Sequence, residues 1–295
     1  MPESIGSPGR LDFRRPPGAI SSFLRAIFDR RPAELEPGAS ARRIDGRILR
    51  LRWRRGLLER FRQVCGYPGS GSLPLTFPHV LAAGMHARML LQPEFPVRLP
   101  GLVHVWHDIR QQRPLEAGED LSLESWIEGH HPVAAGAEFC LHTTVLTGGR
   151  VVWEERTGFL SRAKARGDGR GSPPREVRMT DPRRVSEWTA VPGVGRRYAR
   201  ASGDYNPIHL ANAAARSFGF PAAIVHGMWT LSRAVAELQK VQARPATGVY
   251  VRFKRPVFIP ANLALIAGSP CEEGIPFKVS DPDGRTVFIE GWWQG

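Results

Sequence analysis

The stretch that decides the fold reads Arg197-Tyr-Ala-Arg-Ala-Ser-Gly-Asp-Tyr-Asn-Pro-Ile-His209, and it is soon followed by Gly219-Phe-Pro-Ala-Ala-Ile-Val-His-Gly-Met228. It separates an acid, Asp204, from a titratable base, His209, by a turn. Asn206-Pro207 favours turn initiation. A proline at the first position of a short helix would place His209 in the first turn of that helix. An Asp and a His that converge on one pocket are suited to passing protons.

A helical pattern from Trp229 to Gln239 follows the second stretch. Its entry at Gly227 leaves the first backbone amides as free donors at the positive end of the helix dipole. An acid, a base and helix-end donors are the parts of a site that polarises a carbonyl and moves a proton beside it. Taken singly, each residue also fits a turn, a helix cap or a structural histidine. The ordered string is far more specific.

The string Ser-Gly-Asp-x-Asn-Pro-Ile-His, followed by Gly-Phe-x-x-x-Ile-x-His-Gly-Met, closely resembles the signature of the MaoC-like, (R)-specific enoyl-CoA hydratases (hydratase-2). The resemblance implies an α+β double hotdog, in which each of two long helices is wrapped by an antiparallel sheet. It also implies reversible hydration of trans-2-enoyl thioesters of coenzyme A (CoA) or acyl carrier protein to (R)-3-hydroxyacyl thioesters.

Carried over residue by residue, the resemblance makes Asp204 and His209 the acid–base pair on the catalytic water. Asn206 would hold the loop or the water, and the Gly227 amide would bind the thioester carbonyl. A serine often found eight residues after that glycine is Val235 here, which leaves no hydroxyl for any such role. Neither a metal nor a redox cofactor is needed, because coenzyme A belongs to the substrate.

Composition sets broad limits on the chain. Its 295 residues, with 42% hydrophobic and 23% charged, suit two modest globular domains. No run approaches the roughly 18 apolar residues of a membrane span, and the first residues lack the apolar core of a secretory signal. The cysteines Cys65, Cys140 and Cys271 show neither metal-ligand spacing nor a disulfide framework. We expect a cytoplasmic protein.

The net charge of +13 is almost entirely arginine, since only four of the 41 basic residues are lysine. No nucleic-acid-binding signature accompanies it, so we expect no nucleic-acid partner. Most of the charge fits a compositional bias of the genome, and a local part fits the phosphates of coenzyme A. The basic strand at 248–253 and the residues after it offer Arg252 and Lys254 for those phosphates. A solvated strand face is an equal alternative.

Along the chain, residues 1–40 are predicted to be a flexible arm, 41–163 a first non-catalytic hotdog domain, 164–175 a linker and 176–295 the catalytic hotdog domain. Helices are predicted at 56–64, 77–91, 194–201 and from 227 onward. Strands are predicted at 50–54, 102–109, 120–128, 138–146, 151–160, 248–253, 263–266, 277–279 and 287–292.

An internal repeat supports two copies of one domain. Three pairs of segments match in order: 61–66 with 198–203, 77–85 with 220–228, and 109–114 with 251–256. The first copy has Tyr67 where the second has Asp204, and it lacks the Asn-Pro-x-His loop. A helix beginning near Gly84 would then line the acyl pocket. We therefore expect an internal pseudo-dimer with one active site per chain, and a further homodimer stays open.

Two other functions share this fold. Hotdog domains also serve as acyl thioesterases, which hydrolyse the same thioester bond, so the fold alone does not separate the two reactions. A non-catalytic module that binds an acyl thioester or a protein is the second alternative. It would predict the loss of Asp204 or His209, and both are present.

Overall fold

The computed structural model consists of two compact units, and each is described by itself. Unit 1 comprises residues 1–53, 81–107 and 118–175, and unit 2 comprises residues 54–80, 108–117 and 176–295. Within these units the structure describes residues 10–18, 25, 29–36, 38–69, 71–163 and 176–295.

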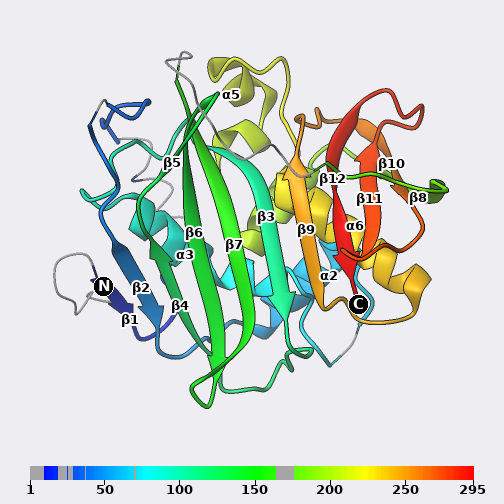
Figure 1. The fold of residues 1–295 in the computed structure, drawn as a ribbon, viewed down its shortest axis with the longest axis horizontal. Helices are drawn as coiled ribbons and strands as arrows, with labels where there is room; N and C mark the ends of the chain where they lie inside the picture. Colours follow the sequence, from blue (N-terminus) through cyan, green and yellow to red (C-terminus); the bar gives the residue numbers. More distant parts are fainter. Residues whose placement is uncertain (1–9, 19–24, 26–28, 37, 70, 164–175) are drawn as a thin grey trace. The chain divides into compact units, whose positions relative to one another are not determined.

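Unit 1 is built on a sheet in the order β1-β2-β4-β6-β7, with β5 paired to β6 (Figure 1). β1 runs parallel to β2 and the other neighbours are antiparallel. Burial alternates along β6, as expected for a strand with one face on a core. The strands are β1 (Arg10–Phe13), β2 (Ile44–Ile48), β4 (Ser122–Ile127), β5 (His131–Val133), β6 (Gly136–Thr147) and β7 (Arg150–Arg162).

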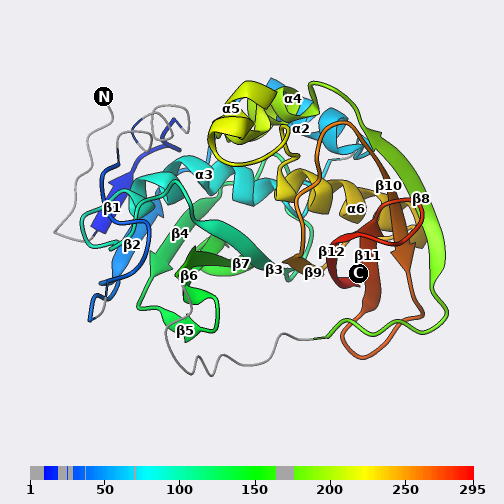
Figure 2. The same ribbon diagram turned by 90° about the horizontal axis from the view of Figure 1, so that it is seen from above.

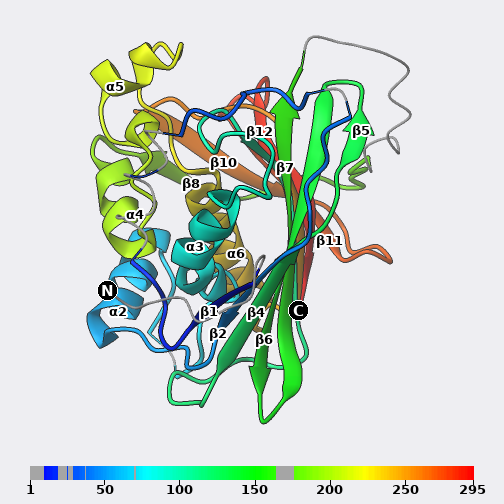
Figure 3. The same cartoon turned by 90° about the vertical axis from the view of Figure 1, so that its left-hand side faces the viewer.

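Helix α3 (Phe77–Leu90) contributes residues 81–90 to unit 1, where it lies against one face of β4, β6 and β7 (Figure 3). The approach is close at Gly46, since a Cβ there would lie 2.7 Å from the Met89 sulfur and 2.9 Å from that of Met85. A side chain at this point of β2 would therefore displace the two methionine side chains.

Part of the predicted arm is held on unit 1. Residues 10–13 form β1, and the Arg31 guanidinium donates hydrogen bonds to the carbonyls of Leu90, Gln92 and Phe95. It also pairs with the Asp29 carboxylate at 2.6 Å. These contacts give the described part of residues 1–40 a defined place.

Unit 2 has a sheet in the order β9-β12-β11-β10-β8, all antiparallel. Helix α6 lies along this sheet, and α2 and α4 pack together on the other side of α6 (Figure 2). β3 (Val103–Gln111) runs from unit 1 into unit 2 at residue 108. The helices are α2 (Arg55–Cys65), α4 (Val194–Ser202), η1 (Pro207–His209), α5 (Asn212–Ser217) and α6 (Gly227–Gln242). The strands are β8 (Arg183–Ala190), β9 (Gly248–Phe253), β10 (Ala261–Ala267), β11 (Ile275–Ser280) and β12 (Val287–Gln294).

Most predicted elements are confirmed, and two assignments are wrong. Residues 50–54 follow β2 and form no strand, although Leu51 is fully buried and its amide bonds the Leu121 carbonyl. Gly84 lies within α3, which begins at Phe77. The predicted elements also did not include the strands β1, β2, β5 and β8 or the helix α5.

The repeat is visible in how its helices end. Gly66 after α2 and Gly203 after α4 are both left-handed, with φ of 76° and 78°, and the amide of each bonds the carbonyl four residues earlier. β3 and β9 end at Gln111 and Phe253, which are equivalent positions in the matched segments.

Each unit combines a long helix with a sheet that is antiparallel except for β1 beside β2, so the predicted α+β class is confirmed. The domain boundaries stay a prediction, and the linker at 164–175 lies outside the described residues. Among the helices that the structure describes, none has the length and apolar character needed to cross a membrane.

Candidate active site

The loop after α4 is shaped by its own side chains. The Asp204 amide donates to Ser202 Oγ (3.2 Å), and the Asn206 amide donates to Asp204 Oδ1 (3.0 Å). Asn206 Oδ1 in turn accepts from the Ile208 amide (3.4 Å) and caps η1. Such side chain-to-backbone bonds are why Asp and Asn favour turns. The prediction that Pro207 starts a short helix carrying His209 is confirmed.

His209 is fixed by one of its two ring nitrogens. Its Nδ1 donates to the Ile224 carbonyl at 2.9 Å, which selects the tautomer whose Nε2 carries a lone pair. Asp204, His209 and His226 each place one side-chain N or O atom within 4.8 Å of the other two. The structure therefore brings the predicted acid and base together.

His226 is a site residue to which sequence reasoning gave no role. It is 2% exposed, and its ring stacks on that of His209 with centroids 3.8 Å apart and planes at 26°. Its Nε2 donates to the Asp204 carbonyl at 3.0 Å and lies 3.8 Å from Asp204 Oδ2. His226 thus connects the acid and the base, and its place before Gly227 was the only signal in the sequence.

Loss of hydration keeps both imidazoles neutral, that of the buried His226 and that of the half-buried His209. Desolvation lowers the pKa of His209 below its ordinary 6.5, against the opposing effects of Asp204 and the Ile224 carbonyl. Desolvation, with His209 second, lowers the pKa of His226 to about 3. At neutral pH the pair therefore offers the His209 Nε2 lone pair as a base and no positive charge.

This electrostatic state predicts the acid limb of the pH profile. A His209 that acts as a base in its neutral form should keep kcat/KM for an enoyl thioester level as pH falls through 6.5. It should decline only below the lowered pKa of His209. Initial rates across a pH series, in buffers of constant ionic strength, measure this limb. A decline that begins above pH 6.5 would contradict a neutral His209 whose pKa is lowered by desolvation.

Gly227 is the first residue of α6, so its amide has no acceptor within the helix. A Cβ at this position would lie 2.8 Å from the Phe253 ring, which therefore packs directly on the glycine. The preceding residue, His226, is extended, with φ −63° and ψ 130°. The amide is thus presented at the helix N-terminus beside an aromatic wall.

Buried polar side chains of α4 and α6 lie beside the site and contact one another or the His226 ring. The Tyr198 ring on α4 lies 4.9 Å from that of His226. On α6, Ser232 Oγ lies 2.8 Å from Thr76 Oγ1, and the Tyr67 hydroxyl lies 3.5 Å from that same Thr76 oxygen. Tyr67, which stands in the first copy where the second has Asp204, lies in unit 2.

Arg252 and Lys254 already have a partner. Arg252 Nη1 lies 3.6 Å and Lys254 Nζ 2.8 Å from Glu290 Oε1. Since Phe253 faces Gly227, alternation places both basic side chains on the other face of the strand. Their proposed contact with phosphates stays a prediction.

Comparison with known proteins shows which family the chain resembles. Residues 171–269, which include all the predicted site residues, match the family model of the MaoC like domain. The chain is 32% identical over 204 residues to 3-hydroxyacyl-thioester dehydratase X of Mycobacterium tuberculosis, covering 68% of this chain and 72% of that protein.

Solved structures show the same architecture. The crystal structure of HtdX from Mycobacterium tuberculosis superposes with a TM-score of 0.70 at 25% identity, covering 85% of this chain and 99% of the other. A MaoC-like dehydratase from Phytophthora capsici gives 0.65 at 18% identity, covering 86% and 95%. A conserved hypothetical protein from Mycobacterium tuberculosis with a double hotdog fold gives 0.54 at 11% identity, covering 81% and 90%. The chain therefore belongs to the MaoC-like dehydratase family, has the double hotdog fold and is a hydro-lyase.

Proposed function

We propose that the protein catalyses reversible hydration of trans-2-enoyl thioesters to (R)-3-hydroxyacyl thioesters. The observation that carries the proposal is the neutral His209 imidazole, with its Nδ1 bonded to the Ile224 carbonyl, close to the Asp204 carboxylate on the loop before α6. The M. tuberculosis relative, named as a 3-hydroxyacyl-thioester dehydratase, supports the same substrate class.

The proton path follows from the tautomers. A water held by Asp204 loses a proton to His209 Nε2 as its oxygen bonds to C3 of the substrate. The electrons of the C2–C3 double bond move toward the thioester carbonyl, and C2 then takes the proton back from the imidazolium. Positioned acid–base groups of this kind accelerate reactions by roughly 10² to 10⁴. Asn206 holds the loop through both of its hydrogen bonds, which keeps Asp204 Oδ1 occupied and leaves Oδ2 for the water.

The negative charge that develops on the carbonyl oxygen needs a donor, and the Gly227 amide supplies it without rearrangement. One such donor is worth about 3 kcal/mol of barrier. The reaction uses the thioester itself to activate C3, so we propose that neither a metal nor a cofactor beyond the substrate's own coenzyme A or acyl carrier protein takes part. A cytoplasmic location likewise stays a prediction from composition.

For Arg252 and Lys254 we retain the proposal of a phosphate contact, shared with Glu290. Replacing both with Gln should raise KM for a CoA thioester and weaken its salt dependence, because the screened charge attraction is lost. Steady-state kinetics at low and high salt measure this. The matched control is Lys278→Gln with Arg285→Gln, which removes the same charge elsewhere in unit 2. An unchanged KM at low salt would assign Arg252 and Lys254 to a solvated strand face.

Crotonyl-CoA distinguishes the proposed reaction from its two alternatives. Hydration removes the absorbance of the conjugated enoyl thioester and leaves the thioester bond intact. A thioesterase would also release a free thiol, which a thiol reagent detects, and a binding module would change neither signal. We expect loss of the absorbance with no thiol released, and release of thiol at the same rate would overturn the proposal.

A further inference from the structure

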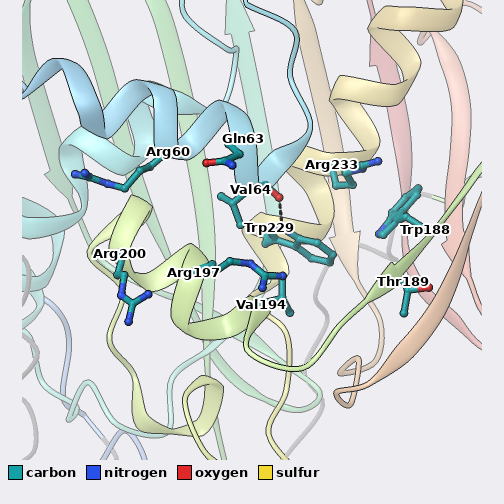
Figure 4. Close-up of a pocket in the computed structure, with 10 residues that line it drawn as sticks. All are labelled: Arg60, Gln63, Val64, Trp188, Thr189, Val194, Arg197, Arg200, Trp229 and Arg233. Atoms are coloured by element: carbon teal, nitrogen blue, oxygen red, sulfur yellow. Dashed lines mark hydrogen bonds between the residues drawn. The ribbon is translucent and has the colours of Figure 1, made fainter.

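Unit 2 has a cavity that includes none of the residues of the candidate active site. It is a cavity of about 360 Å³ between α2, α4, α6 and β8 (Figure 4). This volume is within the range of small-molecule sites. Its walls carry four arginines and two tryptophans, namely Arg60, Arg197, Arg200, Arg233, Trp188 and Trp229.

Helical spacing explains why these side chains gather there. Arg197 and Arg200 are three residues apart on α4, and Trp229 and Arg233 are four apart on α6, so each pair shares one face of its helix. Arg60 adds a third helix, α2. In Figure 4, Arg197 projects from α4 toward Trp229, and Arg233 projects from α6 toward Trp188. The concentration of positive charge thus comes from segments far apart in the sequence.

The charge of the cavity is not balanced. Arg233 pairs with Glu237 at 2.9 Å, but no residue in the cavity wall is acidic. In the part of the chain that the structure describes, Arg60, Arg197 and Arg200 have no carboxylate within salt-bridge distance. Guanidinium groups bind phosphate in bidentate geometry, and three unpaired ones around a cavity favour an anion.

Trp188 adds a preference for a flat ring, since its indole is partly exposed, whereas that of Trp229 is only 3% exposed. The Trp229 indole is held in place because its Nε1 donates to the Val64 carbonyl at 2.8 Å. Trp188 is half-buried, with the Arg233 guanidinium 5.7 Å from its ring centre. Aromatic faces beside arginines stack nucleobases, with each stack worth about 1 to 3 kcal/mol.

We propose that this cavity binds the phosphorylated end of a nucleotide, with its phosphates on the arginines and its base against an indole ring. One source of such a group is the adenosine 3′,5′-bisphosphate portion of the CoA substrate, and the other is a separate nucleotide. That the group belongs to the CoA substrate rests on the proposed function. That the cavity binds a nucleotide does not.

The cavity adjoins the catalytic loop through two elements. Trp229 follows Gly227 by two residues on α6. On α4, the buried Tyr198 stacks toward His226 while its neighbour Arg197 is exposed in the cavity wall. A nucleotide held here would therefore be in contact with the helices that carry the site.

Binding is tested first, by calorimetry with the whole protein. The probes are adenosine 3′,5′-bisphosphate, inorganic pyrophosphate and adenosine. We expect the wild type to bind the bisphosphate. In R197Q/R200Q the Kd for the bisphosphate should rise about tenfold or more, since two charge-assisted contacts are removed. Trp188→Leu should lower the affinity for the bisphosphate and leave the affinity for pyrophosphate unchanged, because pyrophosphate has no base. The control R183Q/R285Q removes two exposed arginines outside the cavity and should change neither.

Kinetics then separate the two sources. If the substrate supplies the nucleotide, R197Q/R200Q raises KM for crotonyl-CoA about tenfold and leaves KM for crotonyl-pantetheine unchanged. If a separate nucleotide binds, binding of the bisphosphate still depends on Arg197 and Arg200. The bisphosphate then does not compete with crotonyl-CoA for binding. Both results support a nucleotide site.

Two results would overturn the proposal. One is no binding of the bisphosphate, or binding that R197Q/R200Q leaves intact. The other is that no nucleotide binds and that R197Q/R200Q raises KM for crotonyl-acyl carrier protein but not for crotonyl-CoA. This surface would then be a protein-docking site. If the wild type hydrates no thioester, the proposed function fails. The calorimetry still shows whether the cavity binds a nucleotide.

Discussion

Asp204→Asn and His209→Ala are each expected to lower kcat for hydration by about 10² to 10⁴, because each removes one of the two groups that we propose to act on the water. Asn keeps an oxygen for the Asn206 amide bond, so the loop should hold its shape. The double variant should lose little more than either single variant, since the two residues act as a unit. Initial rates with crotonyl-CoA and melting temperatures, measured side by side, give the result.

The matched controls are Asp283→Asn and His131→Ala, which change the same residue types at exposed positions. Both should turn over like the wild type. Near-normal rates in a folded Asp204 or His209 variant would remove these residues from the chemistry.

The second large effect is expected at the Gly227 amide. Proline at this position removes the N–H, and the first position of a helix tolerates proline well. His226 already has the extended backbone that a residue before proline prefers. Because Phe253 blocks any side chain at 227, the change is made in a Phe253→Leu background. We expect kcat of G227P/F253L to fall about 10² to 10³ relative to G227A/F253L, which keeps the amide.

This pair of variants isolates the hydrogen-bond donor, because both add a side chain and differ in the N–H. Circular dichroism establishes that α6 is retained. Equal kcat values in the two folded variants would show that the carbonyl oxygen is stabilised elsewhere.

The sequence was most informative where local chemistry and periodicity agree. α6 and the Asp204-to-His209 turn were predicted because a proline, a glycine and an apolar period act within a few residues. The edge strand β8 was missed since its residues are largely polar and exposed, so the pattern resembles a loop. Residues 50–54 were wrongly predicted as a strand because their apolar and polar residues alternate. Their burial does alternate, but they join no sheet, and such a pattern indicates only which side chains are buried.

The site itself was predicted only in part. Asp204 and His209 could be paired from their spacing, but the stacking of His226 on His209 depends on how α6 meets η1. The arginine cavity combines three helices from distant segments, so no local pattern could indicate it. Arg252 and Lys254 illustrate the opposite case, because strand spacing placed them on one face without revealing their shared partner, Glu290.

Hydration of crotonyl-CoA in water enriched in heavy oxygen tests the central claim most directly. The product is separated by chiral chromatography and weighed by mass spectrometry. We predict (R)-3-hydroxybutyryl-CoA carrying the heavy oxygen at C3, with its thioester bond intact, and little of this product from the His209→Ala protein. An (S) product, or heavy oxygen found in a released carboxylic acid, would contradict the account.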